Sequence, residues 1–225
     1  ALGHIKILED LDFGLTKVSL KAFELPVLFE AYRRFAALPN DYPLHLGVTE
    51  AGTPRAGSVR SATGIGTLLA LGIGDTIRVS LTTDPVEEVF VGFEILKSLE
   101  LRQKGATMIA CPTCGRVEVD LFTLANQVDA YLASVREPIR VAVMGCVVNG
   151  PGESRDADVG LAAGNNKGVI FRKGKIVRTV SEADMLDALK HEIELVLEER
   201  RNGIAEDDVT GQYQPARPSL RLTPV

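Results

Sequence analysis

The feature that most constrains the fold is a regular alternation of short β-type runs and helical patterns in the first hundred residues. The β-type runs lie at 16–22, 43–52 and 76–81, and each is followed by apolar residues at helical spacing. The helical patterns cover 26–38, a glycine-containing stretch near 58–72, and 85–101. The last of these begins with Pro85 and acidic residues, as helices prefer. Repeats of this kind predict an α/β fold built from βα units around a parallel sheet.

The pattern continues from residue 106, but two predicted strands now end in cysteine. "ATMIAC" (106–111) and "IRVAVMGC" (139–146) are separated by an amphipathic helical pattern over 119–135. A hairpin is predicted over 168–180, turning at Lys173 and Gly174. Ser181 and Asp184 then resemble a capping box. They predict a helix whose buried face is formed by Met185, Leu189, Ile193, Val196 and Leu197.

A chain of 225 residues is long enough for two domains, and we expect the division after residue 103. Residues 1–103 then form one domain and residues 104–201 the second. Residues 202–225 are polar and contain three prolines, so we expect a mobile tail there. The chain opens "ALGHIKILED", without Met and already within a patterned segment, so we expect a fragment of a longer protein.

Charge and hydropathy narrow the classes of partner. A net charge of −5 argues against nucleic acid, which requires clustered Lys and Arg. No apolar run reaches the roughly 20 residues that a transmembrane helix needs, and no signal peptide is visible, so we expect a cytoplasmic protein. In that reducing compartment the three cysteines are not expected to form structural disulfides.

The cysteines permit several kinds of site. Cys111 and Cys114 form a C-x-x-C pair, a spacing found in redox dithiols, zinc sites and iron–sulfur clusters. Cys146 follows a second strand, and by itself a third cysteine is usually a small buried apolar residue. Ligands of open α/β sheets gather at the carboxyl ends of strands, so the two loops can meet there. A dithiol needs no third cysteine, and structural zinc requires four ligands, whereas the three histidines of the chain lie outside both loops.

A [4Fe–4S] cluster accounts best for three thiolates, and it leaves one iron that needs another ligand. Glu153 is the candidate, because the "NGPG" turn before it can carry its carboxylate back towards Cys146. Carboxylate oxygen is a more exchangeable iron ligand than thiolate, which would leave an open iron site for catalysis. On residue type alone, a solvated loop carboxylate is the more ordinary interpretation of Glu153.

A second candidate site lies at the strand ends of the first half. Ser19 and Lys21 are two residues apart in one predicted strand, as are Arg78 and Ser80 in another, so each pair faces one side. Glu50 follows the strand between them. Charged residues at such strand ends are typical of binding sites in barrels, and Lys with Arg would bind phosphate. Solvated strand-end charges are the alternative for either cation alone.

Five stretches in fixed order resemble one family, the bacterial 4-hydroxy-3-methylbut-2-enyl diphosphate synthases, iron–sulfur enzymes of the non-mevalonate isoprenoid pathway. They are "KVSLKA", "PLHLGVTEAG", "GIGDTIRVSLTTDPVEEVFVGFEILKSL", "ACPTCGR" and "GCVVNGPGE", spanning most of residues 14–164. The resemblance implies the last three βα units of a TIM-type barrel, followed by a sulfite-reductase-like α/β iron–sulfur domain. Its implied cluster ligands are Cys111, Cys114, Cys146 and Glu153, and its implied substrate contacts are Lys21, Glu50, Arg78, Ser80 and Asn149.

The resemblance also implies a reaction and partners. The reaction is the reductive dehydration and ring opening of 2-C-methyl-D-erythritol 2,4-cyclodiphosphate to the linear allylic diphosphate. Electrons would come from ferredoxin or flavodoxin, and a homodimer would share each site between its subunits. The alternatives are a sulfite- or nitrite-reductase-like protein and a non-catalytic electron-transfer or zinc-stabilised module. The reductases use a fourth cysteine, which this chain lacks.

Overall fold

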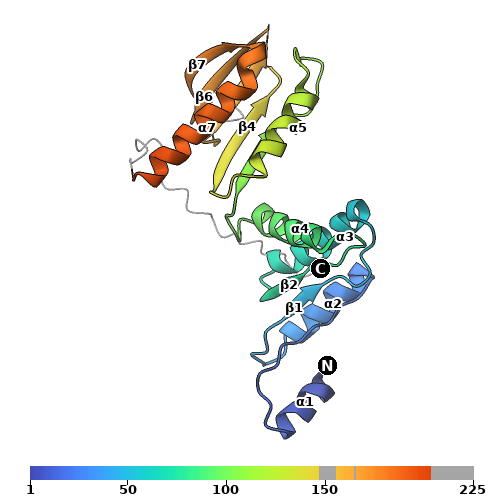
Figure 1. Cartoon of the computed structure of the whole chain (residues 1–225). Coiled ribbons are helices and arrows are strands. Elements are labelled where there is room, and N and C mark those ends of the chain that lie inside the picture. The colour runs from blue at the N-terminus through green and yellow to red at the C-terminus, as the bar shows by residue number, and fades with distance from the viewer. Residues whose placement is uncertain (147–155, 165, 204–225) are drawn as a thin grey trace. The chain divides into compact units, whose positions relative to one another are not determined.

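The computed structural model describes residues 1–146, 156–164 and 166–203. In this part of the chain two compact units are present, residues 1–102 and residues 103–203 (Figure 1). Both combine helices with parallel strands, which confirms the predicted α/β class. The predicted site residues Asn149 and Glu153 and the predicted tail from residue 204 onward lie outside the described residues.

The first unit places helices on one side of a short parallel sheet. Its elements are α1 (Leu2–Asp10), α2 (Leu25–Ala36), β1 (His45–Gly47), α3 (Pro54–Ala70), β2 (Thr76–Arg78) and α4 (Pro85–Ser98). β1 and β2 pair in parallel, so that His45 lies beside Thr76 and Gly47 beside Arg78. Leu46 of β1 and Ile77 of β2 pack with the helices in one apolar core. Helices α2, α3 and α4 carry a proline in their first two positions, as the sequence predicts for α4. At the start of α4 the Asp84 carboxylate also accepts a hydrogen bond of 2.9 Å from Val86 N.

The predicted strand over 16–22 is wrong in one respect: it forms a single isolated bridge, between Val18 and Leu44, rather than a continuous ladder. The reason is the hydroxyl of Tyr32 from α2. It accepts a hydrogen bond of 3.0 Å from Leu20 N and donates one of 2.6 Å to His45 O. These are backbone groups that a continuous ladder would join directly, so the phenol is inserted between the two chains.

Helix α3 approaches its neighbours closely at two glycines of its buried face, Gly57 and Gly64. A Cβ atom on Gly64 would lie 2.6 Å from Val48 Cγ2, and one on Gly57 would lie 2.5 Å from Leu81 Cδ2. Such distances are well inside van der Waals contact, so a side chain at either position would displace these neighbours.

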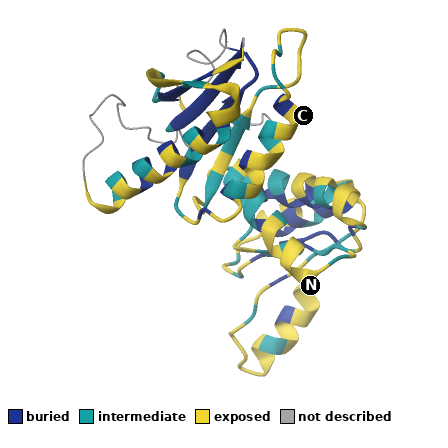
Figure 2. Cartoon of the chain, turned by 45° about the horizontal axis from the view of Figure 1, so that its top comes forward, coloured by how far each residue is buried: buried dark blue, intermediate teal, exposed yellow. Residues whose placement is uncertain are grey.

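The second unit is a five-stranded mixed sheet. Its elements are β3 (Ala106–Ala110), α5 (Leu121–Leu132), β4 (Ile139–Met144), β5 (Val159–Gly164), β6 (Lys167–Arg172), β7 (Lys175–Ser181), the 3₁₀ turn η1 (Glu182–Asp184) and α7 (Met185–Arg201). The spatial order follows the chain, with β3, β4 and β5 parallel and the last two strands antiparallel. β4 and β5 are buried along almost their whole length (Figure 2). The sequence did not predict β5.

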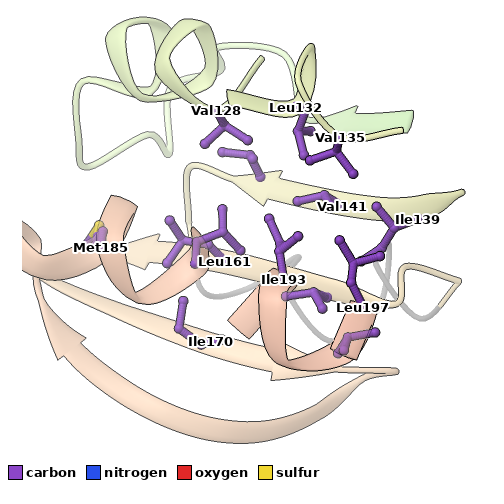
Figure 3. Packing of buried hydrophobic residues seen from close by; sticks show 14 of the residues in the cluster. Val128, Leu132, Val135, Ile139, Val141, Leu161, Ile170, Met185, Ile193 and Leu197 are labelled. Carbon is purple, nitrogen blue, oxygen red and sulfur yellow. The ribbon is translucent and has the colours of Figure 1, made fainter. Parts of the chain in front are cut away.

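Helices α5 and α7 pack on the same face of this sheet (Figure 3). Val128 and Leu132 of α5, together with the buried face of α7, contact alternate residues of β4 and β5, such as Val141 and Leu161. All five α7 residues predicted to share a buried face are buried. The prediction for α7 from its helical period is therefore confirmed.

The other face of the sheet carries a smaller apolar cluster. It consists of Ala142, Met144, Ala157, Ala162 and Phe171. The Phe171 ring occupies the space above Gly160, where a Cβ atom would lie 2.1 Å from Phe171 Cζ. An aromatic residue on β6 is thus accommodated by a residue without a side chain on β5.

The predicted hairpin is confirmed, with Lys173 and Gly174 as its turn residues. Both have positive φ, +46° and +76°, which is the geometry of a two-residue turn that suits the twist of paired strands. The capping prediction is wrong in detail. The Ser181 hydroxyl donates a hydrogen bond of 2.5 Å to the Asp184 carboxylate rather than capping backbone N–H groups, and the η1 turn precedes α7. No helix among the described residues is both long and apolar enough to cross a membrane.

Candidate functional site

One face of the first unit's sheet is polar, and its strand ends carry the predicted anion site. Side chains alternate between faces along a strand, so Leu46 and Ile77 face the helices while His45 and Arg78 face the opposite side. The parallel bridge at Val18 sets Lys21 on this same polar face. The structure thus brings together Lys21 and Arg78, two cations that are 57 residues apart in the sequence.

The centre of this face is a row formed by Lys21, Gly47 and Arg78. A Cβ atom on Gly47 would lie 3.0 Å from Lys21 Cε, 3.4 Å from Lys21 Nζ and 2.9 Å from Arg78 O. Glycine therefore leaves the space in which the Lys21 side chain crosses the sheet. Partial burial, followed by the positive charges of Arg78 and Lys17, lowers the pKa of the Lys21 amine. Mutual repulsion of this kind is relieved when an anion binds.

Serine hydroxyls lie beside the cations. Arg78 Nη2 donates a hydrogen bond of 3.3 Å to Ser80 Oγ, which places this predicted contact next to the guanidinium. Ser19 Oγ donates to His45 O at 3.2 Å. Glu50 lies three residues beyond β1, is exposed, and has a left-handed backbone with φ of +54°. Its conformation belongs to the turn that ends the strand.

Sequence reasoning missed two polar residues on this face, His45 and Lys17. His45 Nδ1 lies 2.8 Å from Thr76 Oγ1 on the neighbouring strand. Burial, and then the charges of Lys21, Lys17 and Arg78 in that order, lower the pKa of His45. The signal was available in the two-residue alternation. The alternation that selects Lys21 also selects Lys17, and it places His45 on the same face of its strand as Gly47.

The two cysteine loops of the second unit meet at neighbouring strand ends. Cys111 directly follows β3, and its backbone N donates a hydrogen bond of 3.3 Å to Val143 O of β4. Gly145 N donates a hydrogen bond of 3.2 Å to the sulfur of Cys111. Since Gly145 directly precedes Cys146, the loops of both cysteines lie against each other, held further by the bond of 3.3 Å from Glu118 N to Gly145 O.

The three sulfurs differ in exposure. Cys146 is buried, Cys111 is half-buried and Cys114 is exposed, and all three are free thiols. Within residues 1–146, 156–164 and 166–203, no three His, Cys, Asp or Glu side chains lie close enough together to hold a metal ion. The local chemistry nevertheless suits a thiolate-held cluster, because a backbone N–H already points at one sulfur, as occurs around iron–sulfur ligands.

Comparisons with known proteins show which protein family the chain resembles. Residues 1–93 match the GcpE TIM-barrel domain, and residues 107–195 match the GcpE protein C-terminal domain. A protein of Dehalococcoides mccartyi strain BAV1, named 4-hydroxy-3-methylbut-2-en-1-yl diphosphate synthase (flavodoxin), is 60% identical over 193 residues, which are 86% of this chain and 55% of that protein.

Two other relatives carry the same name. The Geobacter sulfurreducens protein is 58% identical over 89% of this chain and 56% of its own length. The Bacillus subtilis protein is 56% identical over 88% of this chain and 52% of its own length. The chain thus spans about half the length of the curated relatives it matches. With the barrel-type and C-terminal segments matched in order along 1–93 and 107–195, this chain belongs to the GcpE family.

Proposed function

We propose that the protein catalyses the reductive ring opening and dehydration of 2-C-methyl-D-erythritol 2,4-cyclodiphosphate to 4-hydroxy-3-methylbut-2-enyl diphosphate. Two electrons and two protons enter, one C–O bond to phosphate breaks, and water leaves. Relatives that are 56–60% identical and named for this product support the assignment. The geometric observation that carries it is the row of Lys21, Gly47 and Arg78, a cationic surface at strand ends suited to a diphosphate.

In this proposal the polar face binds and orients the diphosphate. Lys21 contributes a point charge, and Arg78 contributes a planar donor group that pairs with phosphate oxygens. Ser80 adds a hydroxyl at the Arg78 guanidinium. Glu50 and Asn149 are proposed as further substrate contacts. The pKa of Lys21 is lowered in the free protein, and binding of the anion reverses that shift and holds the proton on the amine.

The proposed cofactor is a [4Fe–4S] cluster held by Cys111, Cys114, Cys146 and Glu153. When bound, such a cluster supplies electrons one at a time at low potential. The protein's own contribution is to present sulfur from two loops at adjacent strand ends and to donate the Gly145 N–H to Cys111. That hydrogen bond stabilises negative charge on the sulfur. The carboxylate of Glu153 is the exchangeable ligand in this set.

The proposed electron donor is flavodoxin, which the names of the relatives include, with ferredoxin as the alternative. We also propose a homodimer in which the diphosphate-binding residues and the cluster ligands of one site come from different subunits. The cytoplasmic location stays a prediction of the sequence. Sedimentation or light scattering of the cluster-loaded chain tests the dimer directly.

An anaerobic assay of the cyclodiphosphate with a chemical reductant tests the activity, with the full-length Bacillus subtilis relative as the positive control. Iron and sulfide are counted in the same preparation. About four irons per chain together with turnover supports the proposal. One zinc per chain contradicts the cluster, and a full cluster without turnover of the cyclodiphosphate favours an electron-transfer or sulfite-reductase-like protein.

Replacing Glu153 with Cys separates an enzyme from an electron carrier. A fourth thiolate closes the exchangeable position but leaves the cluster able to accept and release electrons. We expect Glu153→Cys to keep its iron content and to lose turnover. Unchanged turnover in this variant would show that no open iron is needed.

A further inference from the structure

Arg60, on α3, joins the loop after β1 to the loop after the extended segment that carries Lys21, although it carries no role in the proposed chemistry. Its Nη1 donates a hydrogen bond of 2.7 Å to Ala51 O, in the loop after β1. Its guanidinium carbon also lies 4.4 Å from the ring centroid of Phe23. Phe23 belongs to the loop after the extended segment that carries Lys21. One half-buried cation on a helix thus contacts the loops that follow two separate segments of the polar face.

Each contact of Arg60 lies next to a proposed substrate contact. Phe23 is two residues beyond Lys21, and Ala51 directly follows Glu50. The loop after β2 is also connected to the loop after β1. Thr82 N, two residues beyond Ser80, donates a hydrogen bond of 2.9 Å to Gly52 O. The ends of all three segments that bear the cationic row are therefore fixed against one another.

The loop that Arg60 contacts needs such support. Glu50 has φ of +54°, a conformation that costs a residue with a side chain on the order of 1 kcal/mol, and Gly52 has φ of +110°. Ala51 between them is fully buried, and its carbonyl is the group that Arg60 holds. A turn of this shape persists only when its surroundings determine it.

The chemistry at this point requires arginine specifically. A guanidinium offers a flat face for an aromatic ring and, at its edge, N–H groups that donate in fixed directions. Lysine keeps the positive charge but cannot stack flat on Phe23 while donating to Ala51 O in the same geometry. Charge and geometry at position 60 can therefore be separated by experiment.

We propose that Arg60 is a positioning residue, which holds the strand ends that carry Lys21 and Glu50 in the geometry that binds a diphosphate. This inference rests on the proposed diphosphate site. A residue that only stabilises the fold lowers the unfolding midpoint but leaves the affinity of the folded chain unchanged. Affinity well below the unfolding temperature is therefore the deciding measurement.

The test is calorimetric titration of the full chain with inorganic pyrophosphate at two ionic strengths. We expect Arg60→Gln and Arg60→Lys each to weaken binding about tenfold, the effect of losing one hydrogen bond to a charged group. Phe23→Leu, which keeps Arg60 but removes the ring, should weaken binding about threefold, the lower end for a cation–π contact. Arg55→Gln, a change on the exposed first turn of the same helix, is the control and should leave the affinity unchanged.

The outcomes distinguish a failure of the positioning role of Arg60 from a failure of the proposed diphosphate site. If the unchanged chain does not bind pyrophosphate, the diphosphate site itself is wrong. If it binds and Arg60→Lys retains full affinity, position 60 acts through charge alone and the positioning role is overturned. If Arg60→Gln lowers the unfolding midpoint below the assay temperature, Phe23→Leu decides, and unchanged affinity in that variant overturns the inference.

Discussion

The sulfur of Cys111 accepts a hydrogen bond of 3.2 Å from the backbone nitrogen of Gly145, the residue directly before Cys146. This contact joins two cysteine loops that lie 32 positions apart in the chain when counted from Cys114 to Cys146. It arises because β3 and β4 are parallel neighbours, with Ala110 level with Val143, so that both chains leave the sheet at the same edge. The meeting of the loops is therefore a consequence of strand order.

Cys111→Ala should abolish cluster assembly. The change removes the proposed iron ligand and the acceptor of the Gly145 N–H together, and we expect well under one iron per chain, against about four in the unchanged protein. Gly115→Ala is the matched control in the same loop, since a Cβ atom there meets nothing within 4 Å. Iron and sulfide counts after anaerobic reconstitution give the answer. Full loading of Cys111→Ala would remove this residue from the ligand set.

Gly47→Ala should weaken pyrophosphate binding about tenfold or more, the effect of losing one charged hydrogen bond. The added methyl group occupies the path of the Lys21 side chain and approaches Arg78 O, so the amine must move from its position. Gly66→Ala on α3 is the control, because a Cβ atom there has open space, and it should leave binding unchanged while stabilising the helix by up to about 1 kcal/mol. Equal affinities of the two variants would contradict the assigned path of Lys21.

Tyr32→Phe should lower the free energy of unfolding by about 2 kcal/mol, because Leu20 N and His45 O lose their shared partner beside a buried ring. The measurement is urea unfolding followed by circular dichroism. Tyr42→Phe provides the control, since its hydroxyl meets the Glu9 carboxylate at an exposed position and should contribute only about 0.5 kcal/mol. A ranking in the opposite order would show that the Tyr32 bridge adds little.

The charge state of His45 should report on the cationic row. Burial and three nearby cations hold the pKa of His45 below its usual value, so the folded chain binds this proton less readily than the unfolded chain. Its contribution to stability is therefore complete above the unfolded pKa of about 6.5 and is lost as the pH falls towards the folded value. NMR titration should show the pKa of His45 rising in Lys21→Met and on addition of pyrophosphate. No change in either would mean that the cations do not act on the ring.

The fold was predictable where a local signal decides the structure. Proline with acidic residues opens α4, two turn residues with positive φ close the β6–β7 hairpin, and the helical period selects the buried face of α7. β5 was missed because "VGLAAG" consists largely of small residues with little intrinsic preference for strands. Its place in the sheet depends on partners on β4 and β6 that a local pattern does not contain.

In the candidate site, too, some residues could be predicted from a local pattern and others could not. The two-residue period was enough to place Lys21 and Arg78 on one face, since alternation is a property of the strand itself. The same alternation places His45 on that face, but its lowered pKa depends on cations from two other segments, which the period of one strand does not show. The Tyr32 bridge and the Arg60 contacts also escaped prediction, because they join a helix to backbone groups and a ring whose positions only the folded chain fixes.

The packing of Phe171 over Gly160 has an evolutionary corollary. Because the ring fills the volume that any side chain at position 160 would need, a larger residue at 160 displaces the ring, whereas a smaller residue at 171 alone leaves a cavity above Gly160. Relatives with a larger residue at 160 should therefore have a smaller one at 171, and the pair should change together during divergence of the family.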